Sequence, residues 1–175
     1  MPRFKSVDVK LSLLDMFEVT GTWEADETQQ LAAWEIYVEL VTRIAVVELG
    51  AGEGVLREAL SSLHALFDIT RGVLRKGGPD TARPQKKGAL SLGMIAVDVL
   101  NRVLRPFLAR WHPLLLDWEA QRPTGKSPAQ HEAEWSRSGE MRADLQRVQR
   151  VMLDYADLLG TAAGVPSLVR GAREH

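Results

Sequence analysis

Apolar residues at helical spacing are the feature that most constrains the fold of this chain. Beyond Gly54 they recur every three or four residues almost to the end of the sequence. A period near 3.6 residues places them on one face of a helix, and that face must be buried against another element. The pattern therefore predicts a mainly α protein, an antiparallel helical bundle of about four helices.

The boundaries of these helices can be read from capping residues and breakers. Asp26 is a good N-cap for the first helix, and the glycines of residues 50–54 end it. Ser127-Pro128-Ala129-Gln130 forms a capping box that begins the last helix. The expected ranges are 26–49, 55–76, 90–118 and 127–159.

Two details of this helical pattern lead to further expectations. In the first helix, Leu31, Trp34 and Val38 fall at helical spacing and are expected on the buried face. In the third, Pro106 and Pro113 each remove one backbone hydrogen bond. We therefore expect the third helix to be kinked or divided at these prolines.

The N-terminal residues follow a different pattern, with apolar and polar side chains in strict alternation. Val7, Val9 and Leu11 face one side, whereas the residues between them are polar. This period of two predicts a β-hairpin over residues 5–24, lying on the helices because an isolated hairpin is only marginally stable. The whole chain, 1–175, is expected to be a single domain with the bundle over 26–163 and a flexible tail over 164–175.

Composition and charge exclude several classes of function. The formal net charge is -1, so no strong overall field attracts nucleic acid or membranes. The sequence has no cysteine, which excludes disulfides and thiolate chemistry. Its histidines are scattered, so no metal or cofactor is expected. No apolar run reaches the roughly 18 residues of a membrane span, and we expect a cytoplasmic protein without a membrane partner.

The segment GGPDTARPQKKG, residues 77–88, is the clearest loop in the sequence. Its glycines and prolines predict a mobile, solvated connection between the second and third helices. It also carries a basic cluster of Arg83, Lys86 and Lys87. Whether the cluster from Arg83 to Lys87 contacts nucleic acid is left open by the sequence.

The stretch VVELGAGEG, Val46 to Gly54, resembles the first glycine-rich motif of class I methyltransferases. That resemblance implies S-adenosylmethionine as a cofactor. Such a turn requires a strand before it and several further parallel strands, and the chain after Gly54 has helical spacing instead. We therefore interpret the stretch as a turn between helices, and a methyltransferase is the least favoured of three functional hypotheses.

A second motif, RPFLARWH, places Arg105 seven residues before His112. Seven residues turn a helix by about 700°, so the two side chains face nearly the same way. The pair resembles the R-x(4–6)-H motif of the HEPN superfamily, small helical domains that include dimeric, metal-independent ribonucleases. The resemblance implies that His112 handles protons at the RNA 2′-hydroxyl or leaving oxygen and that Arg105 stabilises negative charge. The alternative is a structural histidine beside Trp111, and His64 is expected to be an ordinary residue of a helix surface.

The overall layout is similar to that of small helical proteins of bacterial conflict and anti-phage loci. The segments that carry this resemblance are TWEADETQQLAAWEIYVELVTRI, LREALSSLHALFDITRGVLR and LRPFLARWHPLLLDWE. No catalytic motif defines that group, so the leading hypothesis is a non-enzymatic interaction or accessory protein that binds a protein partner or itself, with a bacterial defence system as its hypothetical setting. Trp118 and Trp135 flank the loop at 119–127 and are the expected partner-binding anchors. Under the alternative, a HEPN-like ribonuclease, Arg105 and His112 are catalytic and RNA is the partner.

Overall fold

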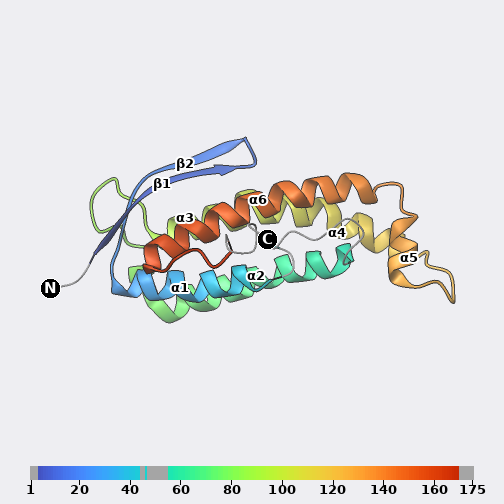
Figure 1. Ribbon diagram of the computed structural model, residues 1–175, viewed down its shortest axis with the longest axis horizontal. Coiled ribbons are helices and arrows are strands. Elements are labelled where there is room, and N and C mark those ends of the chain that lie inside the picture. Colours follow the sequence, from blue (N-terminus) through green and yellow to red (C-terminus); the bar gives the residue numbers. More distant parts are fainter. Residues whose placement is uncertain (1–3, 44–45, 47–54, 170–175) are drawn as a thin grey trace.

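A computed structural model describes residues 4–43, 46 and 55–169 of the chain. It shows a mainly helical protein with a two-stranded antiparallel sheet, as the sequence predicts. The long helices run along the molecule, and the hairpin lies on top of them (Figure 1). The elements are β1 (Lys5–Leu13), β2 (Phe17–Ala25), α1 (Glu27–Val41), α2 (Leu56–Gly77), the 3-10 turn η1 (Gly78–Thr81), α3 (Leu92–Val99), the π-helical segment η2 (Leu100–Leu104), α4 (Arg105–Glu119), α5 (Pro128–Ala133) and α6 (Ser138–Ala163).

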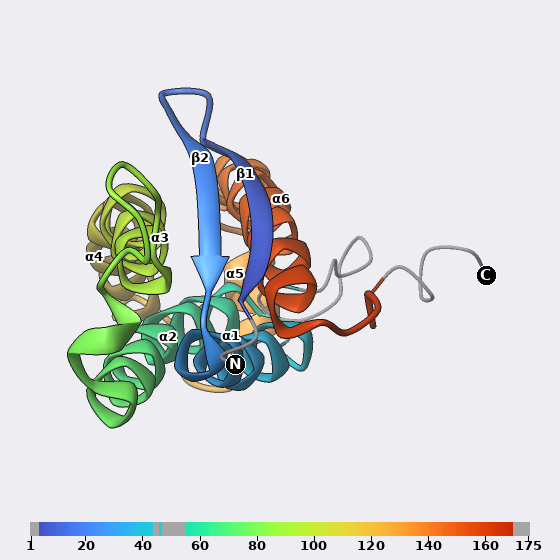
Figure 2. The ribbon, with the colours of Figure 1, turned by 90° about the vertical axis from the view of Figure 1, so that its left-hand side faces the viewer.

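The hairpin β1–β2 confirms the alternation that predicts it. Val9 pairs with Gly21 and Leu13 with Phe17 in one uninterrupted antiparallel register. The apolar residues of β1 are buried, while the residues between them are exposed. Seen along the bundle, the hairpin lies between α3 and α6 (Figure 2). One face of the sheet therefore completes the core, which is how a two-stranded sheet becomes stable.

Helix α1 begins after the predicted N-cap, but it buries a different face from the one expected. The side chain of Asp26 accepts a hydrogen bond from the backbone of Gln29, as an N-cap should. Leu31 and Trp34, expected in the core, are 60% and 39% exposed. The buried residues are Tyr37, which the predicted apolar stripe also includes, together with Gln29, Ala32, Ala33, Ile36 and Leu40. Because α1 carries apolar residues on most of its circumference, the small alanines and a buried polar residue decided which face packs.

The third helical segment is divided at the first of its two prolines. Pro106 lies in the first turn of α4, and the π-helical segment η2 precedes it directly. A proline cannot donate the backbone hydrogen bond of a regular helix, and a π-turn is one way to accommodate that loss. Pro113, in contrast, lies inside α4 without ending it. The prediction of a division is thus confirmed at one proline only.

The last predicted helix is two helices. The capping box of Ser127 and Gln130 is present at the start of α5, as the sequence predicts. The sequence predicts one helix over 127–159 with a weak point at Ser138-Gly139, whereas α5 ends at Ala133 and α6 begins at Ser138, so the helix is interrupted just before that point. Trp135, in the break, is buried and meets the ring of Trp111 edge-on, with 6.0 Å between centroids. The break lets this indole enter the core, and the described helices do not follow the expected division into four.

The loop after α2 is tethered to the core by one buried side chain. The amide nitrogen of Gln29 donates to the carbonyl oxygens of Asp80, at 3.0 Å, and Arg83, at 3.1 Å. Its oxygen accepts from the indole nitrogen of Trp23, at 2.7 Å, and from the backbone of Leu92, at 3.0 Å. The segment expected to be mobile and solvated is therefore held to the core at Asp80 and Arg83 by Gln29.

The methyltransferase-like glycine stretch lies outside the described residues, apart from Val46, which is buried in a turn. In the part of the chain that the structure describes, the only sheet is the antiparallel hairpin, whereas the motif requires a parallel one. None of the described helices is long and apolar enough to cross a membrane.

Candidate functional site

Helices α2 and α4 pack side by side in opposite directions, and an ion pair joins them near the start of α2 and the end of α4. The guanidinium of Arg57 donates two hydrogen bonds of 2.9 Å to the carboxylate of Glu119. On each helix, residues seven positions apart lie on nearly the same face, two turns from each other. Two turns from the ion pair, His64 on α2 therefore lies opposite His112 on α4. Two turns further, Arg71 lies opposite Arg105.

A groove follows this line between the two helices, which we call the α2–α4 groove. Its volume is about 370 Å³. The residues that line it are His64, Phe67, Arg71, Arg105, Leu108, Ala109, His112 and Pro113. Both residues of the RPFLARWH motif thus face one groove, as their spacing predicts, and both are exposed. The groove adds two residues that the motif does not contain, His64 and Arg71.

Two guanidinium groups converge on the apolar floor of the groove. The guanidinium carbons of Arg71 and Arg105 lie 5.6 and 5.3 Å from the centroid of the Phe67 ring. Arg71 is paired with the exposed carboxylate of Asp68 at 2.8 Å. Arg105 donates to the neutral amide oxygen of Asn101 at 3.1 Å, and no described carboxylate is paired with it. Two like charges over one ring favour the binding of an anion between them, and guanidinium groups match the geometry of phosphate.

The ring of His112 is held by a chain of two further residues. Nη1 of Arg57 lies 3.1 Å from Nδ1 of His112. A guanidinium has only N–H donors, so Nδ1 must be the acceptor and the proton of the neutral ring lies on Nε2. The bidentate bonds from Arg57 to Glu119 fix the guanidinium in turn. Glu119 and Arg57 therefore set the tautomer of His112.

His64 occupies the opposite side of the groove and is not restrained in this way. Its exposed ring packs beside Phe67, with centroids 6.3 Å apart, and has no hydrogen-bond partner among the described residues. The sequence analysis treats it as an ordinary surface residue. The signal that identifies it is the heptad spacing of Arg57, His64 and Arg71, which matches that of Arg105, His112 and Glu119.

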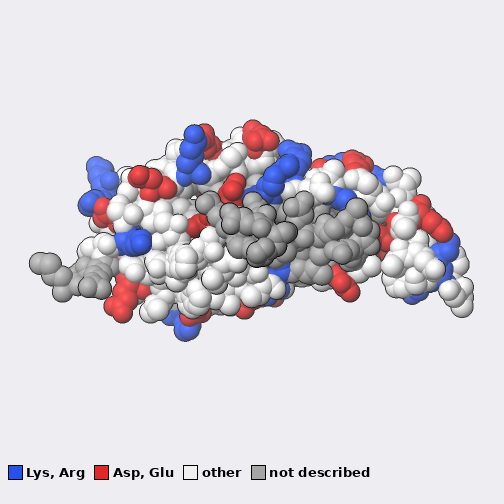
Figure 3. All heavy atoms as spheres, in the orientation of Figure 1, with Lys and Arg blue, Asp and Glu red and all other residues white. Residues whose placement is uncertain are grey.

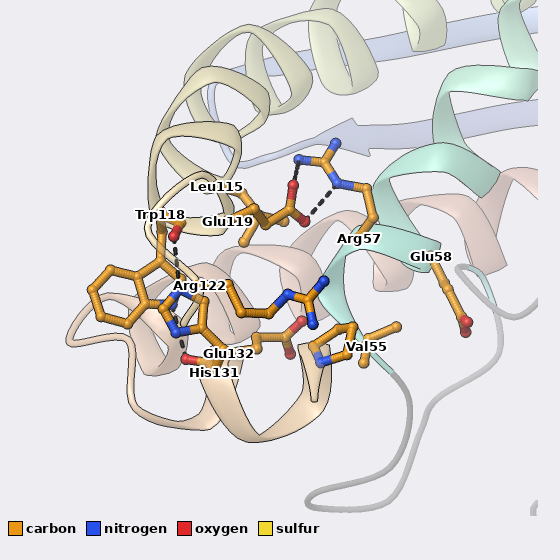
Figure 4. A pocket seen from close by; sticks show the side chains of 10 residues that line it. Val55, Arg57, Glu58, Leu115, Trp118, Glu119, Arg122, His131 and Glu132 are labelled. Carbon is orange, nitrogen blue, oxygen red and sulfur yellow. Dashed lines mark hydrogen bonds and ion pairs between the residues drawn. The ribbon is translucent and has the colours of Figure 1, made fainter. Parts of the chain in front are cut away.

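A second pocket, of about 410 Å³, lies where the groove reaches α5 (Figure 4). In it Arg57 and Glu119 point toward each other, and Trp118 stacks on His131 with 4.3 Å between ring centroids. The indole nitrogen of Trp118 donates to the carbonyl of His131 at 2.8 Å, and Nε2 of His131 donates to the carbonyl of Trp118 at 2.7 Å. These reciprocal bonds join the end of α4 to α5.

Glu132, which also lines this pocket, caps the start of α2. Its buried carboxylate accepts a 2.8 Å hydrogen bond from the backbone of Leu56 and lies 3.2 Å from Arg142. Burial raises the pKa of Glu132, although the bond from Leu56 and the charge of Arg142 oppose that rise. Val55, the residue at the N-cap position, supplies no side-chain bond. The polar groups of this second pocket therefore hold α2, α4 and α5 together.

The remaining candidate residues lie in different settings. Trp118 lines the second pocket and is half-buried against His131, whereas Trp135 is a core residue outside both pockets. In the basic loop, Arg83 is paired with Asp80 at 2.9 Å and Lys86 with Glu24. On the visible face, basic and acidic residues are interspersed (Figure 3). Binding of a polyanion would therefore depend on a local arrangement such as the α2–α4 groove.

Comparisons with known proteins do not indicate a function, so the functional site must be inferred from the geometry of the described residues. No protein-family model matches the chain, and neither a curated protein nor a solved structure shows a significant match. Among the described residues, no group of three or more histidine, aspartate or glutamate side chains is placed to hold a metal ion. Among the described residues, the pair of histidines and the pair of arginines in the α2–α4 groove bring together imidazole and guanidinium groups.

Proposed function

We propose that the protein is a metal-independent ribonuclease that binds the backbone of RNA in the α2–α4 groove. The observation that carries this proposal is the shared groove of Arg105 and His112, the two residues of the HEPN-like motif. Cleavage of RNA by its own 2′-hydroxyl requires a group that moves protons and cations that stabilise charge on the phosphorus oxygens. Imidazole and guanidinium side chains supply both within one groove.

The electrostatics of the groove favour a phosphodiester as its ligand. Arg71 and Arg105 lie over one aromatic ring, and although Asp68 offsets the charge of Arg71, Arg105 has no carboxylate partner among the described residues. A phosphate group that bridges them accepts hydrogen bonds from both. Because these contacts are made to the backbone of the nucleic acid, we expect binding that depends on salt concentration more than on base sequence.

Cleavage of a single-stranded RNA oligonucleotide in the presence of EDTA tests this function. We expect the wild-type protein to produce fragments ending in a 2′,3′-cyclic phosphate and a 5′-hydroxyl. Arg105→Ala and His112→Ala should lose most of this activity while keeping the melting temperature, because both side chains are exposed. Arg150→Gln, an exposed arginine of α6 outside the groove, serves as the matched control. Absence of cleavage by the wild-type protein, or equal activity in all variants, would refute the proposal.

A second candidate function, a protein-interaction module of a bacterial defence system, is favoured by a different observation. Leu31 and Trp34 lie one turn apart on α1, and they are 60% and 39% exposed. Neighbouring exposed apolar side chains are typical of surfaces that bind a partner or a second copy of the chain. We expect light scattering to show self-association that Leu31→Gln with Trp34→Gln weakens and Arg105→Ala leaves intact. A monodisperse monomer in the wild type would count against self-association through this surface.

A further inference from the structure

The hydrogen bonds around His112 restrict what this residue can do in the proposed reaction. Its Nδ1 accepts from Arg57, so Nε2 carries the proton and no lone pair of the ring faces the groove. A ring in this state donates a hydrogen bond but cannot accept a proton from a 2′-hydroxyl. The bidentate ion pair between Arg57 and Glu119 maintains the restriction, since it holds the guanidinium in place. A different group must therefore act as the base.

His64 is placed to be that group. It lines the same groove from α2, at the level of His112 on α4. Its ring is exposed and makes no hydrogen bond within the described residues, so one ring nitrogen is free to accept a proton. Asp68, one turn further along α2, is paired with Arg71 instead. His64 is thus the unrestrained imidazole of the groove.

We propose that His64 is the proton-transfer residue of the groove, and that His112 is a hydrogen-bond donor positioned by Arg57 and Glu119. This inference rests on the proposed ribonuclease function and reverses the role that the motif alone assigns to His112. The substrate phosphate then lies between the two histidines, with Arg71 and Arg105 two turns away along the groove. Arg57 and Glu119 are positioning residues, because they act through His112.

The reaction balances with these groups alone. His64 takes the proton of the 2′-hydroxyl while the 2′-oxygen forms a bond to phosphorus. Nε2–H of His112 stabilises the negative charge on the phosphorus oxygens, while Arg71 and Arg105 hold a neighbouring phosphate of the RNA backbone. The bond from phosphorus to the 5′-oxygen breaks, and the imidazolium of His64 returns its proton to that oxygen. The products are a 2′,3′-cyclic phosphate and a 5′-hydroxyl, and His64 ends in its starting state.

The tautomer of His112 can be measured without any substrate. In a nitrogen-15 spectrum of the imidazole rings, we expect His112 of the full-length protein to carry its proton on Nε2. Arg57→Met should convert it to a mixture of the two tautomers and leave the spectrum of His64 unchanged. A proton on Nδ1 in the wild-type protein, or no change in Arg57→Met, would overturn the positioning by Arg57 whether or not the protein cleaves RNA.

Cleavage kinetics test the division of roles between the two histidines. His64→Gln should lower kcat by about 100-fold or more with KM nearly unchanged, and should abolish the loss of rate at acidic pH that protonation of a base causes. His112→Gln, which keeps an N–H donor, should lose less activity and retain that acidic limb. If His112→Gln removes the limb and His64→Gln keeps it, the ribonuclease function stands and our assignment is wrong. If the wild type shows no cleavage, the function and the role of His64 fail together, while the spectrum still decides the state of His112.

Discussion

Replacement of Gln29 should be among the most destabilising changes in the chain, although this residue is polar and far from the groove. Its side chain is fully buried at the junction of the hairpin, α1, α3 and the loop after α2. The amide makes four hydrogen bonds with groups from three other parts of the chain, the hairpin, the loop after α2 and α3. Gln29→Met keeps nearly the same shape and volume but removes all four bonds. The substitution therefore isolates the polar contribution from the packing.

The cost can be worked out from the burial of the four partners. The bonds to the indole of Trp23 and the backbone of Leu92 are buried. Loss of their acceptor leaves two buried N–H donors that water cannot reach and that have no hydrogen-bond partner, which costs about 1–3 kcal/mol each. The bonds to the carbonyls of Asp80 and Arg83 are partly buried, and water can replace part of their energy, so we assign about 0.5–1 kcal/mol each. The sum is a loss of roughly 3–8 kcal/mol in the free energy of unfolding. After the folded and unfolded states relax around the new side chain, about 3–5 kcal/mol of that loss should remain.

Urea denaturation followed by circular dichroism would measure this loss. For a chain of this size, a loss of 3–5 kcal/mol corresponds to a melting temperature lower by about 6–20 °C. The matched control is Gln121→Met, because Gln121 is exposed and its amide donates only to the carbonyl of Asp117. That variant should stay within about 0.5 kcal/mol of the wild type. If the two variants were equally stable, the assignment of Gln29 as the tether of the loop would be refuted.

Two further predictions concern a close helix contact and the cap of α2. A Cβ atom at Gly160 would lie 3.1 Å from the ring of Tyr37, whereas one at Gly72 would meet nothing within 4 Å. In thermal melts Gly72→Ala should be more stable than the wild type by about 0.5–1 kcal/mol, and Gly160→Ala should lack this gain and fall about 1–3 kcal/mol below Gly72→Ala. Burial raises the pKa of Glu132 from 4.5, so the folded state holds the proton of this carboxyl more tightly than the unfolded chain does. The protonated group therefore contributes stability at low pH, and this contribution declines as pH rises through the raised pKa. Glu132→Gln keeps an acceptor for Leu56 but cannot titrate, so its stability relative to the wild type should increase from pH 4 to 7 in urea melts, and a decrease would contradict the raised pKa.

The parts of the fold that the sequence predicts are those decided by neighbouring residues. The alternation in β1, the N-cap at Asp26 and the capping box at Ser127 each depend on side chains within a few positions. The same holds for α2, whose apolar stripe is narrow enough to define one buried face. Local signals of this kind are present in the chain before any tertiary contact forms.

Other parts of the fold depend on contacts between distant segments. The face that α1 buries is decided by the four partners of Gln29 and by the approach of Tyr37 to Gly160, none of which is visible in the spacing of α1 itself. The break before α6 is likewise decided by the place that the core offers to Trp135 beside Trp111. Hydrophobic spacing shows that a helix is amphipathic, but on a helix with apolar residues on several sides it does not choose between them.

The α2–α4 groove depends both on local sequence spacing and on contacts between distant segments. The spacing of Arg105 and His112 predicts correctly that they share a face, because both lie on one helix. That His64 completes the groove depends on the register of α2 against α4, to which the ion pair of Arg57 and Glu119 contributes beside the packing of the core. Because the two helices are antiparallel, residues seven apart on each face one another in successive pairs, and the two histidines lie opposite each other next to this ion pair. The same ion pair also holds the tautomer of His112, so a change at Arg57 should alter the chemistry of His112 while core packing keeps His64 opposite it.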